Sequence, residues 1–231
     1  MNQALILFSG GIDSTTALYW ARERYENIFA LTFDYGQRHK IEVRLAKRLC
    51  QKLHIHQKIL RLNLKQIGGS SLTDNQIPVP EFSACDEITE GTPSTYVPFR
   101  NGILLSVAAA WAEVKGISEI VCGFNTMDSP NYPDTRLPFV EAMESAINQG
   151  TKYSCGQKKM KIHAPFINMK KSEIIKLGLS LGADYSFSVS CYSGKEVPCL
   201  KCSSCIMRQK AWHDVQMEDP LILRLKKEGK L

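Results

Sequence analysis

The chain has 231 residues, of which 44% are hydrophobic and 23% are charged, and its formal net charge is +6. This composition is typical of a globular protein with a substantial core, and it excludes collagen-like, disordered and mini-protein classes. No apolar run reaches the roughly 20 residues that cross a bilayer, and the first residues lack the basic and cleavable features of a secretory signal. The sequence therefore predicts a cytoplasmic protein without a membrane segment, whose cysteines are reduced.

Strand and helix patterns alternate from the start of the chain. Residues 4–8 (ALILF) form an apolar run that ends at two adjacent glycines, which is typical of a strand buried on both faces of a parallel sheet. Helical spacing of apolar residues follows over 14–25 and again over 40–53, and strand patterns follow these helices at 28–33 and 58–62. Together these segments predict two successive βαβ units.

The alternation resumes after a long polar segment. Residues 65–98 are rich in Gly, Ser, Pro and Asp and show little periodicity, which favours a functional loop. The later segments are a helix at 101–114, a strand at 119–124, a polar turn at 125–136, a helix at 137–148, a strand at 161–165 and a helix at 171–181. We therefore predict an α/β fold with an open, mostly parallel sheet and helices on both faces, whose ligands bind beyond the carboxyl ends of the strands.

The turn after the first predicted strand has the composition of a phosphate-binding site. It reads SGGIDS over residues 9–14, directly before a helix. Adjacent glycines let successive backbone N–H groups point into one concavity, and the start of the helix adds partial positive charge. Asp13 stands where a Walker A loop has lysine, and a carboxylate fits there if it holds Mg²⁺ against the phosphates. The structural alternative is a tight turn in which Asp13 or Ser14 caps the helix.

The SGGIDS string after a buried strand resembles the PP-loop of the N-type ATP pyrophosphatases. This resemblance implies an adenine nucleotide α-hydrolase-like fold and cleavage of ATP between its α and β phosphates. AMP is transferred to a carbonyl or carboxylate oxygen and is then displaced by ammonia or another nucleophile, while positioned donors and Mg²⁺ stabilise the developing charge. The resemblance places ATP on the loop and the first helical turns, namely Phe8, Ser9, Gly10, Gly11, Ile12, Asp13, Ser14, Thr15, Thr16, Ala17 and Leu18.

Four cysteines near the C-terminus have the spacing of a metal site. Cys191, Cys199, Cys202 and Cys205 read C-x7-C-x2-C-x2-C. Four thiolates at about 2.3 Å complete a closed tetrahedral site, so we predict one structural Zn²⁺ that fastens the end of the chain and performs no chemistry. An iron–sulfur cluster is the alternative. We accordingly predict an ATP-binding α/β domain at 1–185 and a zinc-binding segment with its tail at 186–231.

An ordered set of motifs identifies the chain more closely. These are SGGIDS, DYGQRH at 34–39, YVPFRN at 96–101, YPDTR at 132–136 and the four-cysteine end. The set resembles the 7-cyano-7-deazaguanine synthases of queuosine biosynthesis, from residue 4 to about residue 212. The resemblance implies an ATP-dependent carbon–nitrogen ligase that converts 7-carboxy-7-deazaguanine and free ammonia into 7-cyano-7-deazaguanine through adenylated acid and amide intermediates. It also implies a homodimer.

Under this resemblance five further side chains receive roles. Lys171 is assigned to the phosphates, and Arg100 with Asn101 to the substrate carboxylate or the ATP phosphates. Asp134 is expected to accept hydrogen bonds from the guanine-like ring, and Arg136 to pair with a carboxylate or phosphate. The structural alternatives are a solvated helix lysine, a helix cap at Asn101 and a local Asp134–Arg136 ion pair. With the aspartate of the PP-loop, Lys171 and Arg100 are the predicted catalytic residues.

Two other functions remain as alternatives. A tRNA-modifying PP-loop enzyme would use the basic run at 224–230 and the thiols to contact RNA, but such enzymes need a larger binding surface. The hypothesis of a non-enzymatic zinc-ribbon binding module explains neither the two βαβ units nor the presence of Asp13 in the glycine-rich turn. We therefore expect small-molecule substrates, no stable nucleic-acid partner, and a basic run that is a solvated tail.

Overall fold

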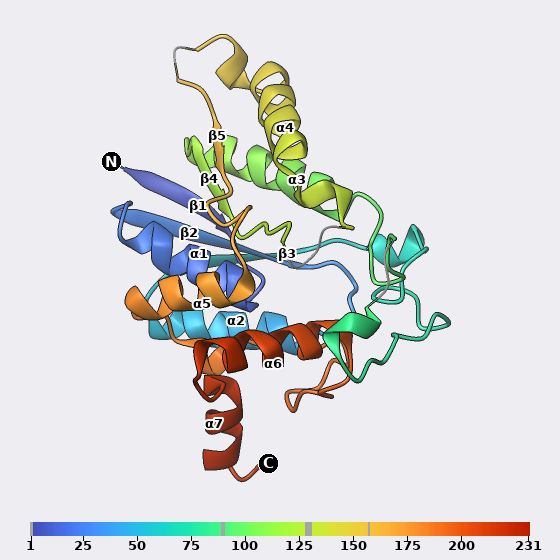
Figure 1. Ribbon diagram of the computed structural model, residues 1–231. Helices are drawn as coiled ribbons and strands as arrows, with labels where there is room; N and C mark the ends of the chain where they lie inside the picture. The colour runs from blue at the N-terminus through green and yellow to red at the C-terminus, as the bar shows by residue number, and fades with distance from the viewer. Residues whose placement is uncertain (1, 89–90, 128–130, 157) are drawn as a thin grey trace.

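Five parallel strands form one sheet at the centre of the molecule (Figure 1). The computed structural model describes residues 2–88, 91–127, 131–156 and 158–231. The strand order is β3-β2-β1-β4-β5, so the chain builds outward from β1 to β3 and then returns to the other side of β1 for β4. The bounds are Gln3–Leu7 (β1), Asn27–Asp34 (β2), His56–Arg61 (β3), Glu119–Cys122 (β4) and Lys161–His163 (β5).

The central strands are buried on both faces because their side chains alternate between two hydrophobic layers. Leu5, Leu31 and Ile120 belong to one layer, and Ile6 and Val121 belong to the other. All five side chains are fully buried. The open parallel sheet predicted from the apolar runs is therefore confirmed.

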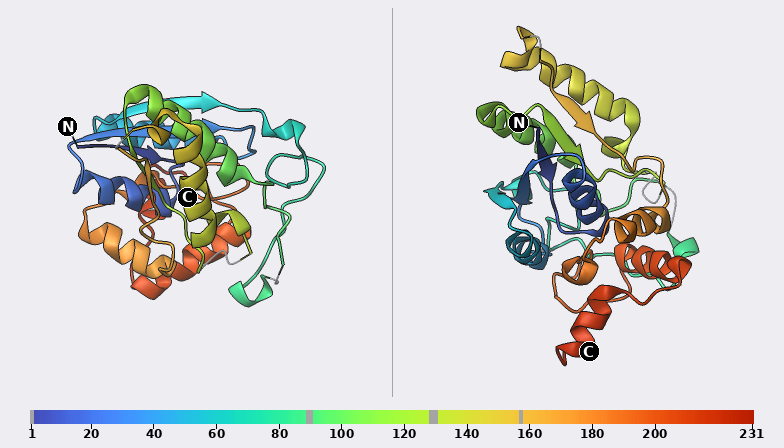
Figure 2. Two further views of the ribbon diagram at one scale, coloured as in Figure 1. Left: turned by 90° about the horizontal axis from the view of Figure 1, so that it is seen from above. Right: turned by 90° about the vertical axis from the view of Figure 1, so that its left-hand side faces the viewer.

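Helices cover both faces of this sheet, as Figures 1 and 2 show. The layer that holds Ile6 also contains α1, α2, α5 and α6, and the layer that holds Leu5 contains α3 and α4. Within the described residues no helix is long and apolar enough to span a bilayer. The bounds are Ile12–Arg22 (α1), Ile41–Lys52 (α2), Arg100–Lys115 (α3), Leu137–Gly150 (α4), Lys171–Ser180 (α5), Ser203–Val215 (α6) and Pro220–Lys227 (α7), with 3-10 turns at Leu64–Gln66, Cys85–Glu87, Pro133–Thr135, Lys152–Ser154 and Tyr185–Phe187.

The first five helices lie within a few residues of their predicted positions, but the sequence patterns do not predict α6 and α7. The prediction of a solvated basic tail is wrong for the inner face of α7. Asp219 caps this helix by accepting a hydrogen bond from Leu221 N at 2.9 Å, and Pro220 occupies its first turn. Leu221 and Leu225 share one helix face and are fully buried in a cluster with residues of α2.

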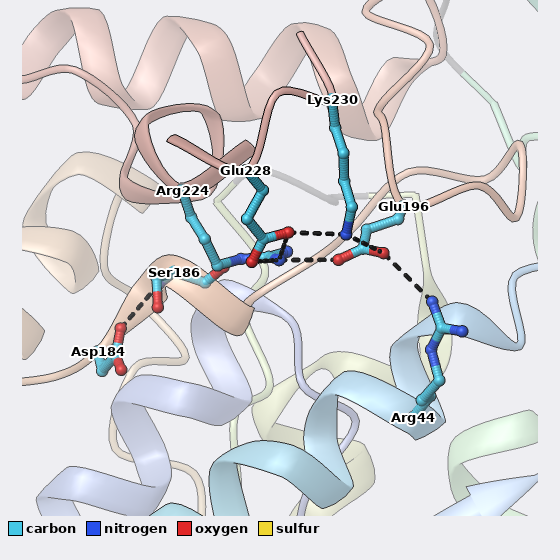
Figure 3. A network of polar contacts seen from close by, with 7 residues as sticks. All are labelled: Arg44, Asp184, Ser186, Glu196, Arg224, Glu228 and Lys230. Carbon is cyan, nitrogen blue, oxygen red and sulfur yellow. Dashed lines mark hydrogen bonds and ion pairs between the residues drawn. The ribbon is translucent and has the colours of Figure 1, made fainter. Parts of the chain in front are cut away.

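A network of charged side chains holds α7 in place (Figure 3). Arg224 Nη1 donates hydrogen bonds to Glu196 at 2.8 Å and to Glu228 at 2.9 Å. Lys230 and Arg44 each donate to the Glu196 carboxylate at 3.2 Å. Although burial opposes its ionisation, the hydrogen bonds from Arg224 and Lys230 hold the pKa of Glu196 below its usual value. The network thereby ties α7 and α2 to the loop that carries Glu196.

The long polar segment at 65–98 lies along the cysteine segment. Phe82 N donates to Lys201 O at 2.7 Å, and Glu81 forms an isolated antiparallel bridge with Cys202. The Arg38 guanidinium donates to two backbone carbonyls of the same segment. Residues 89–90 of the predicted loop at 65–98 and residues 128–130 of the predicted turn at 125–136 lie outside the described residues. The domain boundary at 185 stays a prediction.

Candidate functional site

The turn between β1 and α1 is held in shape by its own serines. Gly10 has a φ of +88°, in the left-handed region that favours glycine. Its N–H donates to Ser14 Oγ at 3.0 Å, and the N–H of Gly11 donates to Ser9 Oγ at 3.3 Å. Gly11 is the N-cap of α1, and no side chain among the residues that the structure describes caps this helix. Asp13 and Ser14 therefore belong to the first turn of α1, and neither residue is its cap.

The lack of a Cβ atom on Gly10 lets α2 pack directly against this turn. A Cβ atom at Gly10 would lie 3.1 Å from Ala46 Cβ and 3.3 Å from the carbonyl oxygen of Glu42. The turn also follows β1, and β1 pairs with both β2 and β4 at the point where the strand order reverses. Open α/β sheets bind their ligands at this switch point, beyond the carboxyl ends of the strands.

Asp13 and Lys171 meet beside the turn although 158 positions separate them in the chain. Lys171 Nζ donates to Asp13 Oδ2 at 2.7 Å and to Oδ1 at 3.0 Å. The Lys171 side chain is 18% exposed, and the Asp13 side chain is 23% exposed. Lys171 opens α5, and its ammonium group is a partner of the carboxylate at the start of α1. The alternative of a solvated helix lysine is therefore wrong.

A cavity of about 300 Å³ opens at this end of the sheet. The predicted site residues on its wall are Phe8, Ser9, Gly11, Ile12, Asp13, Ser14, Arg100, Asn101 and Lys171. The predicted residues that do not line it are Gly10, Thr15, Thr16, Ala17, Leu18, Asp134 and Arg136. The four α1 members of the second group are fully buried beneath the turn, where Thr16 Oγ1 lies 2.6 Å from the Tyr185 hydroxyl. Their contribution to the site is to hold α1 in position.

Arg100 begins α3 and contributes a guanidinium group to the cavity beside Tyr35. Its Nη1 donates to the Tyr35 hydroxyl at 3.3 Å, and its guanidinium carbon lies 5.8 Å from the centre of the tyrosine ring. Burial raises the pKa of Tyr35, so this hydroxyl stays neutral. In the described part of the chain no carboxylate forms an ion pair with the Arg100 guanidinium, and the buried Asp134 carboxylate acts on it only through its charge. An anionic group of a ligand would balance this partly buried charge.

Asp134 reaches Asn101 at the start of α3. Its Oδ2 accepts a hydrogen bond from Asn101 N at 2.9 Å, and Asn101 Nδ2 donates to the Asp134 carbonyl at 3.1 Å. Asp134 is buried, and its Oδ1 has no hydrogen-bond partner among the described residues. Phe99 is the N-cap of α3, so Asn101 is not the cap of its helix. Arg136 is exposed at the N-cap of α4. The structure thus brings Asn101 and Asp134 together and leaves Arg136 away from the cavity wall.

Several cavity residues have no role in the interpretation of the sequence. His39 and Glu42 line the cavity from the segment that follows β2, and Tyr132 and Tyr192 line it from two other loops. The DYGQRH string is a sequence signal for His39, because it begins at the carboxyl end of a strand beside β1, whereas Glu42 lies three residues beyond the string. No comparable sequence signal marks Tyr192, whose place on the wall depends on how the cysteine segment packs.

The four predicted cysteines form one cluster. Their Sγ atoms all lie within 4.8 Å of one another. Tetrahedral Zn–S bonds of about 2.3 Å place the sulfur atoms about 3.8 Å apart, and Cys199 Sγ and Cys205 Sγ are 3.9 Å apart. The donor set therefore fits one tetrahedral metal ion.

Local backbone geometry supports this cluster. Leu200 has a φ of +62°, which turns the chain back between Cys199 and Cys202. The N–H of Cys199 donates to Cys191 Sγ at 3.2 Å, and the N–H of Cys202 donates to Cys199 Sγ at 3.4 Å. Such donors stabilise the thiolate form that a metal requires.

The cysteine segment also forms one side of the cavity. Val189 N donates to Gly10 O at 3.2 Å, which joins this segment to the turn after β1. Ser190, Tyr192 and, from α6, Arg208 line the cavity as well. A metal ion that orders the cysteines would therefore also order one wall of the cavity.

Similarity to solved structures concerns the fold alone. A predicted subunit of a tRNA methyltransferase from Methanocaldococcus jannaschii aligns with a TM-score of 0.50 at 16% identity, over 78% of this chain and 75% of that chain. A 4-thiouridine synthetase, solved as an RNA complex with bound ATP, aligns with a TM-score of 0.50 at 20% identity, over 97% of this chain and 53% of that chain. Both similarities support the α/β architecture.

Similarity in sequence is much closer. Proteins named 7-cyano-7-deazaguanine synthase are 45% identical in Saccharophagus degradans, over 94% of this chain and 96% of the relative, and 44% identical in Clostridium kluyveri, over 96% and 97%. The relative of that name in Rickettsia prowazekii is 42% identical over 96% of this chain and 99% of its own length. The family model described as Queuosine biosynthesis protein QueC matches residues 3–216. The chain therefore belongs to the QueC family of queuosine biosynthesis proteins, whose members similar to it are named 7-cyano-7-deazaguanine synthase.

Proposed function

We propose that the chain is an ATP-dependent ligase that converts 7-carboxy-7-deazaguanine and ammonia into 7-cyano-7-deazaguanine. The acid becomes an amide and the amide a nitrile, and neither oxygen atom leaves readily at neutral pH. Each step therefore uses one ATP to adenylate the oxygen that departs. The observation that carries this proposal is that one cavity wall contains both the Asp13–Lys171 pair and the Arg100 guanidinium.

The PP-loop is assigned to the phosphates of ATP. Because α1 begins without a side-chain cap, its first N–H groups can bind phosphate oxygens. Asp13 is assigned as the ligand of Mg²⁺, which when bound neutralises charge on the phosphates and on the leaving pyrophosphate. Lys171 is assigned to the phosphate oxygens, since its ammonium group already lies at the carboxylate that would take the metal.

The start of α3 is assigned to the acid substrate. Arg100 offers a guanidinium without a carboxylate partner in the described structure, and Asn101 lies beside it on the wall. Asp134 Oδ1 lacks a partner among the residues described and is assigned to the N–H groups of the deazaguanine ring, which requires the wall beside Thr135 to open because Asp134 itself does not line the cavity. Arg136 is assigned to a carboxylate or phosphate, although only a movement of its exposed side chain would bring it to the cavity.

The cysteine cluster is assigned one Zn²⁺ with a structural role. Four protein ligands fill a tetrahedral site and leave no position for water or substrate. The family resemblance further implies a homodimer. The cytoplasmic location and the lack of a nucleic-acid partner stay predictions.

Mass spectrometry tests the proposed function directly. The purified protein is incubated with Mg-ATP, ammonium and 7-carboxy-7-deazaguanine, and the nucleotide and deazaguanine products are followed over time. We expect the nitrile with two AMP formed per turnover. Formation of ADP would contradict α,β-cleavage of ATP, and a lack of any nitrile would contradict the assignment of the substrate.

A further inference from the structure

The proposed reaction releases protons inside the cavity. Ammonia that displaces AMP from the acyl adenylate yields the amide, AMP and one proton. The O-adenylated amide then yields the nitrile and AMP as its nitrogen loses a second proton. Proton transfer to a positioned base accelerates such steps, so a group on the cavity wall is needed that can accept a proton near neutral pH.

Most titratable groups on the described wall do not meet this requirement. Burial raises the pKa of the Tyr35 and Tyr192 hydroxyls and of the Cys122 thiol, so these groups keep their protons. The guanidinium groups of Arg100 and Arg208 have no site that accepts a proton.

The other groups are already engaged. The Asp13 carboxylate binds the Lys171 ammonium group, and the proposed function assigns both to the phosphates and Mg²⁺. The Tyr132 hydroxyl lies 2.7 Å from a threonine hydroxyl. Among the described wall residues this leaves His39 and Glu42.

His39 and Glu42 form a buried imidazole–carboxylate pair. His39 Nε2 lies 3.4 Å from Glu42 Oε1, and the two side chains are 5% and 13% exposed. His39 Nδ1 is buried and has no hydrogen-bond partner among the described residues. Burial raises the pKa of Glu42, an effect that His39 and a hydrogen bond from Gln37 oppose. An imidazole that a carboxylate orients and that keeps one ring nitrogen without a partner has the arrangement of a general base.

The surroundings hold Glu42 in a fixed orientation. Gln37 Nε2 donates to Glu42 Oε1 at 3.0 Å and to Phe33 O at 3.1 Å, and Gln37 Oε1 accepts from Tyr35 N at 2.7 Å. These bonds anchor the carboxylate to the carboxyl end of β2.

The pair lies between the phosphate-binding turn and the cysteine segment. The Glu42 carbonyl oxygen would be 3.3 Å from a Cβ atom at Gly10, and the His39 ring centre is 5.7 Å from that of Tyr192. The charged and titratable groups that face the pair are Tyr192 from the cysteine segment, Arg100 from α3 and Tyr35 from the end of β2.

On the basis of the proposed function, we propose that the His39–Glu42 pair accepts the proton that ammonia releases when its nitrogen forms the C–N bond and AMP departs. The imidazole takes the proton, Glu42 stabilises the resulting imidazolium, and the proton then passes to water. The same pair takes the nitrogen-bound proton when the adenylated amide becomes the nitrile. Neither role requires the pair to take part in the adenylation of the acid.

The experiment separates adenylation from nitrogen transfer in His39→Gln and Glu42→Gln. Adenylation is measured as exchange of labelled pyrophosphate into ATP that depends on 7-carboxy-7-deazaguanine. Nitrogen transfer is measured as amide and nitrile formation with ammonium. It is measured in steps of about one pH unit from about pH 6 to about pH 9, a range that includes the pH at which histidine ordinarily titrates. His213→Gln is the matched control, because this histidine side chain on α6 is 92% exposed.

We expect both variants to retain exchange and His39→Gln to lose about 10²–10⁴-fold in nitrogen transfer at neutral pH. Raising the pH should restore part of this rate, because hydroxide and buffer bases in bulk water can then accept the proton. A parallel fall of exchange and nitrogen transfer, or no change in either, would overturn the assignment of the pair. Wild-type protein without exchange would instead overturn the proposed function, and this inference with it.

Discussion

Gly123, directly after β4, lies against the peptide group that joins Asp13 to Ser14. A Cβ atom at Gly123 would be 2.7 Å from the carbonyl carbon of Asp13 and 2.8 Å from Ser14 N. These are backbone atoms of α1, so they cannot move aside as a flexible side chain can. The close contact between β4 and the PP-loop therefore depends on the absence of a side chain at position 123.

Gly123→Ala is expected to displace the PP-loop. Overpacking of this kind costs about 1–3 kcal/mol in the free energy of unfolding, and ATP affinity should fall because the loop presents its donors differently. Urea unfolding and nucleotide titration measure the two effects. Gly150→Ala at the end of α4 is the matched control, since no atom of the described residues lies within 4 Å of its added Cβ. Equal stability and ATP affinity in the two variants would contradict this prediction.

Asp13→Asn is expected to abolish adenylation while the fold persists. The amide oxygen can still accept a hydrogen bond from Lys171, but it carries no negative charge to pair with the ammonium group and is a weaker ligand for Mg²⁺. We expect a loss of at least about 10²-fold in pyrophosphate exchange, the usual scale for removing one charge-stabilising group. Circular dichroism confirms folding, and Asp214→Asn on the exposed side of α6 serves as control. Retained exchange in Asp13→Asn would rule out the proposed role.

Removal of the bound metal is expected to loosen the wall that carries Val189. Because Val189 N donates to Gly10 O, loss of order in the cysteine segment should weaken ATP binding as well. We expect elemental analysis to find about one zinc ion per chain, and Cys202→Ser to lose it. Cys155→Ser, at an exposed cysteine outside the cluster, should keep the metal. Unchanged metal content in Cys202→Ser would contradict the assignment.

Acid is expected to release α7. A carboxyl group whose pKa falls on folding stabilises the folded state above its unfolded pKa, and this stabilisation declines as the pH drops through the folded value. The pKa of Glu196 is lowered, and hydrogen bonds from Lys230 and Arg224 lower that of Glu228 to about 2. The loss should therefore develop between the ordinary carboxyl range and about pH 2.

Hydrogen exchange in α7 measures this release. Protection of its amides, relative to that of β1, should decrease with acid in the wild type, and Glu196→Gln should weaken protection already at neutral pH. Glu218→Gln removes only an exposed pair with Lys226 and should have little effect. Identical protection in both variants would show that the Glu196 network does not hold the helix.

Much of the architecture could be predicted because the spacing of apolar residues within one segment indicates whether that segment is a strand or a helix. The apolar run at residues 4–8 predicts a buried parallel strand, and β1 is such a strand. The helix α6 was not predicted because its apolar residues do not recur at a helical spacing. Its Trp212 is nevertheless buried in the core. Arg224 belongs to the basic run at 224–230, yet its side chain is only 10% exposed and pairs both with Glu228 in the same run and with Glu196, which lies 28 residues earlier in the chain.

The sequence by itself determined the glycine-rich turn at 9–14 and the four-cysteine cluster, because each consists of residues close together in the chain. It also determined the family, because the order of such local motifs along the chain can be read without the fold. Only the tertiary structure decided which distant side chains share the cavity. Lys171 reaches Asp13, Asp134 reaches Asn101, and His39 faces the cysteine segment because of the strand order and the packing of the helices. Contacts of this kind depend on how separate segments bury their apolar surfaces together, which no local spacing records.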